Sequence, residues 1–83
     1  MTQSTRTAAQ IGVLVRRERR KQGLTQADLG LKSGMRQATI SRLESGEPAI
    51  QLQTLLDVLA ALQLELNVSQ REEFDLSELE RLF

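Results

Sequence analysis

The sequence lacks both cysteine and histidine, and its only aromatic residues are two Phe. The missing Cys and His exclude disulfides, thiolate zinc sites and catalysis by an imidazole acid or base. The 83 residues form at most one domain, and its core has to be built from Leu, Ile, Val and Ala. This composition favours a small helical domain that gains further burial by forming a dimer.

Long hydrophobic runs are also absent, since no apolar stretch approaches the roughly 18 residues that a membrane-spanning helix needs. Near the N-terminus a short apolar run precedes the basic cluster RRERRK, the reverse of the order in a secretory signal. There is no Gly-rich phosphate loop and no carboxylate cluster in a plausible pocket. We therefore expect a cytoplasmic protein that is not an enzyme, has no cofactor or metal, and binds neither a membrane nor a small-molecule substrate.

The zero net charge hides an excess of basic residues in the first half of the chain and of acidic residues in the second. Residues 1–45 contain nine basic and three acidic side chains, whereas residues 46–83 contain two basic and eight acidic ones. A polyanion is the simplest partner for the first half, and a different kind of partner for the second. Two ordinary solvated surfaces are the alternative.

Apolar residues at helical spacing predict a first helix over residues 8–22. Gly23 ends it, because glycine readily adopts the left-handed conformation that follows a helix. The preceding residues 1–7 are polar and offer no evident cap, so we expect a flexible N-terminus there.

A second helix begins at the capping-box sequence TQAD, in which Thr25 and Asp28 satisfy each other's backbone N–H groups. It is about seven residues long, has Leu29 and Leu31 as candidates for burial, and ends at Gly34. Together with the helix that follows, this spacing is typical of a helix-turn-helix unit.

The third helix is predicted over residues 36–45, with Ile40 and Leu43 facing inward and Glu44 on the border of that face. Its first residue, Arg36, cannot cap the helix and opposes the helix dipole. A DNA phosphate or guanine edge beside this helix end would explain such an arginine. The outward-facing residues are small or polar: Ala38, Ser41, Arg42 and Ser45.

A fourth helix is predicted over residues 51–62, where Leu recurs every three or four residues. Residues 62–68 then alternate between apolar and polar, as in a half-buried strand whose apolar face is Leu64, Leu66 and Val68. Because the sequence has no second strand, the economical solution pairs this strand with the same strand of a second copy. The predicted fold is all-α, with four to five helices and a short C-terminal β-strand that pairs across a homodimer.

The last residues form an acidic tail, 69–83, after a DNA-binding and dimerisation domain that spans residues 8–68. The tail has apolar residues spaced for one short amphipathic helix: Phe74, Leu76, Leu79, Leu82 and Phe83. These side chains dock on the protein's own core, bind a partner, or belong to a disordered segment.

Residues 8–62 resemble the Xre or lambda-repressor type of helix-turn-helix domain. The resemblance rests on GLTQADLGLKSGMRQATISRLESG followed by a Leu-rich helix. It implies that the third helix reads double-stranded operator DNA in the major groove. It also implies an ion pair between Arg19 and Glu44, and a phosphate contact by Gln26 that supports Gln37. The family usually has alanine at the position of Gly30. Glycine fits there but weakens the second helix by up to about 1 kcal/mol.

The candidate DNA contacts follow from the chemistry of base and phosphate recognition. Arg pairs with guanine, Gln pairs with adenine, and the Ala methyl group contacts the thymine methyl. The predicted base contacts are Arg36, Gln37, Ala38, Ser41 and Arg42. The predicted phosphate contacts are Thr25, Gln26 and Ser45, together with helix N-terminal amides. Ordinary surface polarity is the alternative for Gln37 and Ser41. For Arg42 the alternative is a solvent-exposed ion pair with Glu44 or Glu47.

Within that family, RQATISRLESG and the ending ALQLELNV are most similar to the HipB antitoxins, partners of HipA-type kinase toxins. This similarity implies a dimer that represses its own operon and neutralises a HipA-like kinase toxin. The operator half-sites would then lie about one helical turn, or about 34 Å, apart. The alternatives are a stand-alone Xre-type repressor without a toxin, and an inhibitory adaptor whose DNA binding is incidental.

Overall fold

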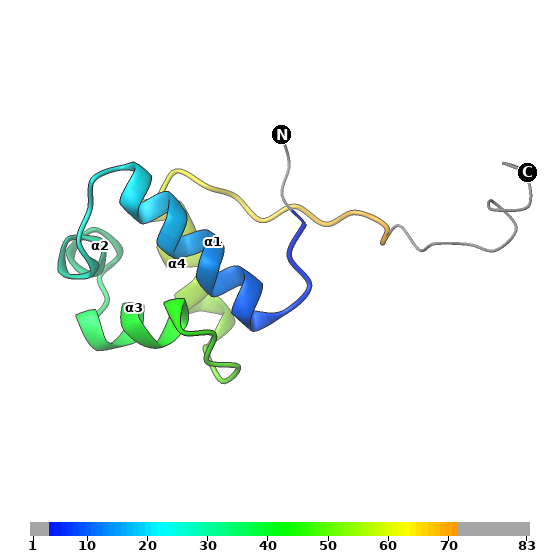
Figure 1. The fold of residues 1–83 in the computed structure, drawn as a ribbon, viewed down its shortest axis with the longest axis horizontal. Helices are drawn as coiled ribbons and strands as arrows, with labels where there is room; N and C mark the ends of the chain where they lie inside the picture. Colours follow the sequence, from blue (N-terminus) through cyan, green and yellow to red (C-terminus); the bar gives the residue numbers. More distant parts are fainter. Residues whose placement is uncertain (1–3, 72–83) are drawn as a thin grey trace, which may run out of the picture.

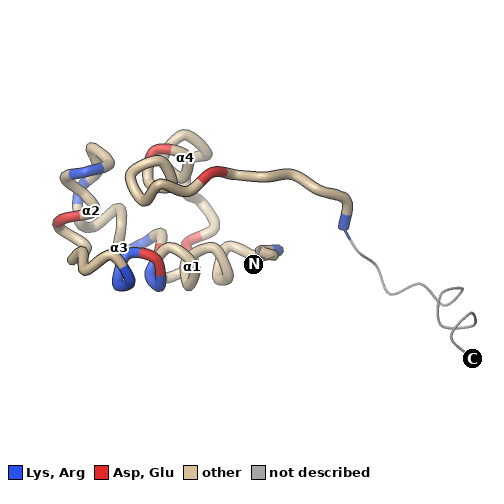
Figure 2. Tube along the Cα trace, turned by 90° about the horizontal axis from the view of Figure 1, so that it is seen from above, with Lys and Arg blue, Asp and Glu red and all other residues tan. Residues whose placement is uncertain are grey.

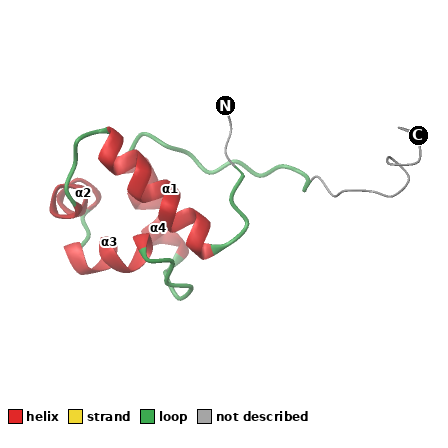
Figure 3. Cartoon of the chain, in the orientation of Figure 1, coloured by secondary structure: helices red, strands yellow, loops and turns green. Residues whose placement is uncertain are grey.

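The computed structural model describes residues 4–71, and within this range the chain forms four helices and no strand (Figure 1, Figure 3). The helices are α1 (Ala8–Lys21), α2 (Gln26–Ser33), α3 (Gln37–Glu44) and α4 (Leu52–Ala61). An extended segment follows α4, and α2 and α3 lie at the end of the molecule away from it. The all-helical prediction and its helix-turn-helix unit are thus confirmed. The candidate partner-binding residues of the tail lie outside the described residues.

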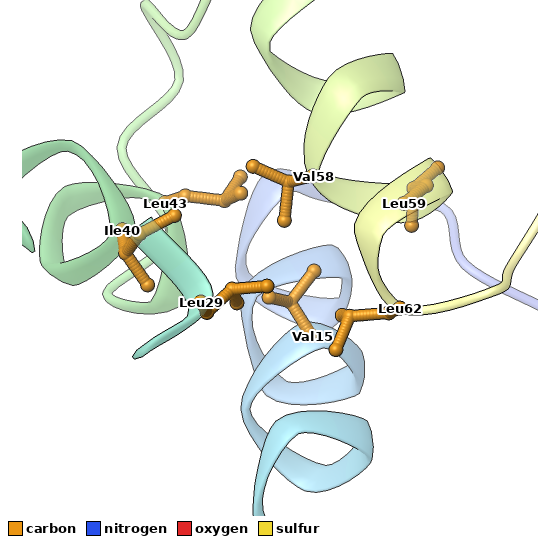
Figure 4. Packing of buried hydrophobic residues seen from close by; sticks show 7 residues of the cluster. All are labelled: Val15, Leu29, Ile40, Leu43, Val58, Leu59 and Leu62. Carbon is orange, nitrogen blue, oxygen red and sulfur yellow. The ribbon is translucent and has the colours of Figure 1, made fainter. Parts of the chain in front are cut away.

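The core is built from aliphatic side chains that all four helices contribute (Figure 4). Its buried members are Val15, Leu29, Ile40, Leu43, Val58, Leu59 and Leu62. Burying each of these side chains stabilises the fold by roughly 1.5–3 kcal/mol. The predicted aliphatic core is therefore confirmed, including the inward face of α3.

Three leucines expected on buried faces are instead exposed: Leu31, Leu52 and, only just, Leu56 at 37%. Leu31 is 85% exposed because it lies about 200° around α2 from the buried Leu29, on the opposite side of the helix. Leu52 is 65% exposed because it is the first residue of α4, at the mouth of a groove that it lines with Pro48 and Ile50. The predicted apolar faces were therefore too wide in both helices.

The start of α1 also differs from the prediction. Thr7 is the N-cap of α1, and its hydroxyl oxygen accepts from the backbone N–H of Gln10 at 3.1 Å. The expectation of an uncapped helix start was wrong because the sequence TAAQ is itself a capping-box pattern.

All four helices end in the same hydrogen-bonded motif, in which a backbone N–H beyond the helix reaches back to a carbonyl five residues earlier. These donor–acceptor pairs are Leu24 to Arg19 (3.0 Å), Met35 to Gly30 (2.8 Å), Glu47 to Arg42 (3.1 Å) and Leu64 to Leu59 (2.8 Å). The motif requires one left-handed residue, which is a glycine in the first three helices. In α4 it is Gln63, with φ of 62°, so no glycine signalled this helix end in the sequence.

The strand predicted over residues 62–68 is not formed within the single described chain. Its first two residues instead end α4, with Leu62 as the C-cap and Gln63 in the left-handed conformation. Leu64 packs against the core, whereas Leu66 is 51% and Val68 is 93% exposed. Among residues 4–71, no helix has the length and hydrophobicity needed to cross a bilayer.

Candidate nucleic-acid interface

The close crossing of α2 and the turn depends on Gly30. A Cβ atom at this position would lie 2.7 Å from the carbonyl oxygen of Met35, which is closer than real Cβ contacts. Gly34 supplies the left-handed residue of the turn, with φ of 72°. Gly30 therefore does more than replace the alanine usual in related domains, because in this chain an alanine would displace the backbone of the turn.

The predicted capping box at the start of α2 is confirmed. The Thr25 hydroxyl accepts from the N–H of Asp28 at 3.0 Å, and the Asp28 carboxylate accepts from the N–H of Thr25 at 2.9 Å. The backbone N–H and then the hydroxyl of Thr25 hold the pKa of Asp28 below its usual value. The first turn of α2 is thereby fixed, with its remaining N–H groups and the positive end of the helix dipole at the surface.

A buried ion pair ties α1 to the end of α3, as the resemblance implies. Arg19 Nε donates to Glu44 Oε2 at 2.6 Å, and Arg19 Nη2 donates to Glu44 Oε1 at 2.9 Å. The two side chains are 9% and 3% exposed. The bond to Glu44 raises the pKa of Arg19 above its already high value, so the guanidinium stays protonated. The third guanidinium nitrogen, Nη1, donates to the carbonyl oxygen of Leu24 at 2.8 Å.

The same carboxylate also holds the first residue of α2. Gln26 Nε2 donates to Glu44 Oε1 at 3.2 Å. The amide of Gln26 therefore bonds to the last residue of α3 in the free protein. Its support of Gln37 on DNA, which the resemblance implies, stays a prediction. Glu44 thus joins three helices through one buried group.

The outer face of α3 carries the predicted base contacts. All five are exposed: Arg36, Gln37, Ala38, Ser41 and Arg42. Arg36 occupies the N-cap position with an extended backbone, and its side chain makes no capping hydrogen bond. The sequence had placed Arg36 just inside the helix, whereas the structure places it one residue before the first helical turn. Its guanidinium is therefore not used to satisfy the helix end.

The predicted phosphate contacts fall in two places. Thr25 and Gln26 lie together at the N-terminus of α2, where Thr25 is exposed and Gln26 is half-buried. Ser45 lies at the C-terminal end of α3, and its hydroxyl donates to the carbonyl oxygen of Arg42 at 2.8 Å. In this conformation the Ser45 hydroxyl has no proton left for a phosphate, so the structure brings only two of the three candidates together.

Basic residues are concentrated on the helices around this unit. Figure 2 shows Lys and Arg positions on α1, α2 and α3, whereas α4 carries none. Within residues 4–71, no group of three or more carboxylates is arranged to hold a metal ion. The arrangement fits an anionic polymer that meets the exposed side of α3 and the N-terminus of α2.

Gly12 also positions the site, although it was not among the residues predicted from the sequence. A Cβ atom at Gly12 would lie 2.6 Å from the carbonyl oxygens of both Leu43 and Glu44. Gly12 therefore lets α1 lie directly against the C-terminal end of α3. A glycine inside a predicted helix is a signal of close packing, and it could have been noticed.

Comparisons with known proteins agree with this geometry. A helix-turn-helix family model matches residues 15–69. Similar solved structures include a HipB–O4 20mer complex, with 28% sequence identity and a TM-score of 0.80 over 86% of this chain and 100% of that one. A HipA–HipB–O2–O3 complex matches with the same sequence identity, TM-score and coverage of both chains. A HipB–O1–O2 complex matches at 29% identity and a TM-score of 0.77, over 83% of this chain and 100% of that one. Among curated proteins, none matches the chain.

Proposed function

Because this chain belongs to the helix-turn-helix family, we propose that it is a dimeric repressor that binds palindromic operator DNA and neutralises a HipA-like kinase toxin. The observation that carries the proposal is the exposed, polar face of α3, which Gly30 and the buried Glu44 hold against the rest of the domain. The similarity to HipB structures, one of them a complex with HipA, supports both parts of the role.

On operator DNA, α3 lies in the major groove and its exposed residues read base edges. Arg42 or Arg36 donates two hydrogen bonds to a guanine, and Gln37 pairs with an adenine. Thr25 and Gln26 hold a phosphate at the N-terminus of α2, where the helix dipole favours an anion. Arg36 cannot cap the helix, and its charge at this helix end is favourable only next to DNA, where it meets phosphates and guanine edges.

We expect Arg42→Ala to reduce the preference for operator over scrambled DNA by about tenfold, within the range for losing one bidentate base contact. The operator is first selected from a random duplex library with the wild-type protein. Titrations at one fixed salt concentration then give the affinity for each duplex.

Arg16→Ala is the matched control, because it removes the same charge from an exposed position on α1, outside the reading helix. It should weaken binding to both duplexes to a similar, small extent. An unchanged ratio of affinities for Arg42→Ala would remove Arg42 from the base contacts.

The dimer in this proposal forms through residues 64–68, whose backbone pairs with the same segment of a second copy. The exposure of Leu66 and Val68 supports this pairing, because a second copy would cover both side chains. The pairing would also satisfy backbone groups that have no ladder partner within one chain.

The toxin-binding role is assigned to the acidic tail, residues 69–83. We expect deletion of this segment to abolish inhibition of the HipA-like kinase while operator affinity changes by less than about twofold. The reason is that the four helices and their core lie wholly before residue 69.

The measurements are kinase activity in the presence of each protein and operator titration of the same samples. Inhibition that survives the deletion would place the toxin contact elsewhere. If neither protein inhibits the kinase, the chain is a stand-alone repressor.

A further inference from the structure

The buried carboxylate of Glu44 links the two helices of the helix-turn-helix unit. It is the last residue of α3, and its side chain is 3% exposed. Its Oε2 accepts from Arg19, and its Oε1 accepts from both Arg19 and Gln26. The side chain therefore connects the last residue of α3 to the first residue of α2.

We propose that Glu44 is a positioning residue for DNA binding, which acts by holding the amide of Gln26 in the orientation that donates to a phosphate. This inference rests on the proposed function. Glu44 itself stays buried and does not touch DNA. Arg19 supports the arrangement because its fork fixes both oxygens of the carboxylate.

The geometry at Gln26 explains why positioning matters there. A glutamine side chain has three rotatable bonds, and fixing it only on binding would cost side-chain entropy that weakens the contact. The bond from Nε2 to Glu44 uses one of the two amide protons and fixes the amide group in the free protein. The second proton remains for a phosphate at the N-terminus of α2.

Charge alone predicts the opposite effect, and this makes the proposal testable. Neutralising Glu44 removes an anion from the DNA-binding side and leaves Arg19 unpaired, so simple electrostatics would strengthen binding to any duplex. Loss of positioning weakens it. In Glu44→Gln, the strong bond from Arg19 Nε keeps the remaining oxygen at the Oε2 position. The new NH2 group then faces both Arg19 Nη2 and the Gln26 amide as donor to donor.

The experiment is a double-mutant cycle with full-length wild type, Gln26→Ala, Glu44→Gln and the double variant. Each is titrated with scrambled duplex DNA at several salt concentrations. We expect Gln26→Ala to weaken binding about tenfold per protomer, as for one lost hydrogen bond to a charged group. Glu44→Gln should weaken it about three- to tenfold, and the double variant should bind no more weakly than Gln26→Ala alone.

Circular dichroism at the binding temperature establishes that each variant is folded. If Glu44→Gln does not fold, Glu44→Asp replaces it, since the shorter carboxylate keeps the charge for Arg19 but withdraws from Gln26. The positioning role would be overturned if the affinity losses of the two single variants multiply in the double variant. It would also be overturned if a Glu44 variant binds DNA more tightly than the wild type. A wild-type protein that binds no duplex would overturn the proposed function and this inference together.

Discussion

Replacing Arg19 by methionine should lower the free energy of unfolding by about 3–5 kcal/mol, the cost of leaving a buried charge without its partner. The variant keeps a long side chain but removes all the donors. Both oxygens of Glu44 then lose Arg19, and the carbonyl of Leu24 loses its bond to Nη1. For a chain of this length the total stability is about 4–12 kcal/mol, so the variant loses roughly a quarter of it or more.

The companion variant is Arg19→Met with Glu44→Met, in which two apolar side chains replace the whole pair. It should be more stable than Arg19→Met alone, because no buried charge is left unpaired. Urea denaturation measures both variants, and a shift in midpoint with an unchanged slope reports a change in stability. A loss below about 1 kcal/mol for Arg19→Met, typical of exposed ion pairs, would contradict the buried role of this pair.

Gly12→Ala should cost about 3 kcal/mol, the upper end of the usual range for adding one methyl group to a packed interior. The added Cβ would meet two backbone carbonyl oxygens at 2.6 Å, and backbone atoms cannot turn away as a side chain can. Alanine favours a helix over glycine by up to about 1 kcal/mol, so a net loss means that packing outweighs propensity. The same change separates α1 from α3 and so loosens the reading helix.

Gly23→Ala is the matched control. It makes the same chemical change where no atom lies within 4 Å of the new Cβ, but at a φ of +73°. It should cost about 1–2 kcal/mol from backbone strain alone. Thermal unfolding of the two variants under identical conditions compares them, and equal losses would show that the close approach of α1 to α3 carries no extra cost.

Features that depend on neighbours along the chain were predictable from the sequence. The helices followed from apolar spacing, three of the four helix ends from glycines, and the start of α2 from its capping box. The amphipathic pattern of α3 separated the buried Ile40 and Leu43 from the exposed polar residues. The ion pair between Arg19 and Glu44 came from resemblance to a family, since its members are 25 residues apart in the chain.

By itself, then, the sequence determined the four helices, the helix-turn-helix unit and the polar face of α3, because capping, helical periodicity and glycine turns act within a few residues. Only the tertiary structure decided the close approach at Gly12, the link from Gln26 to Glu44 and the exposure of Leu52. These depend on which faces meet and at what distance. The left-handed Gln63 belongs with them. Leu62 and Leu64, on either side of Gln63, pack in and against the core and hold Gln63 in a conformation that glutamine itself disfavours. This turn sets the direction of residues 64–68, the segment proposed to pair with a second copy.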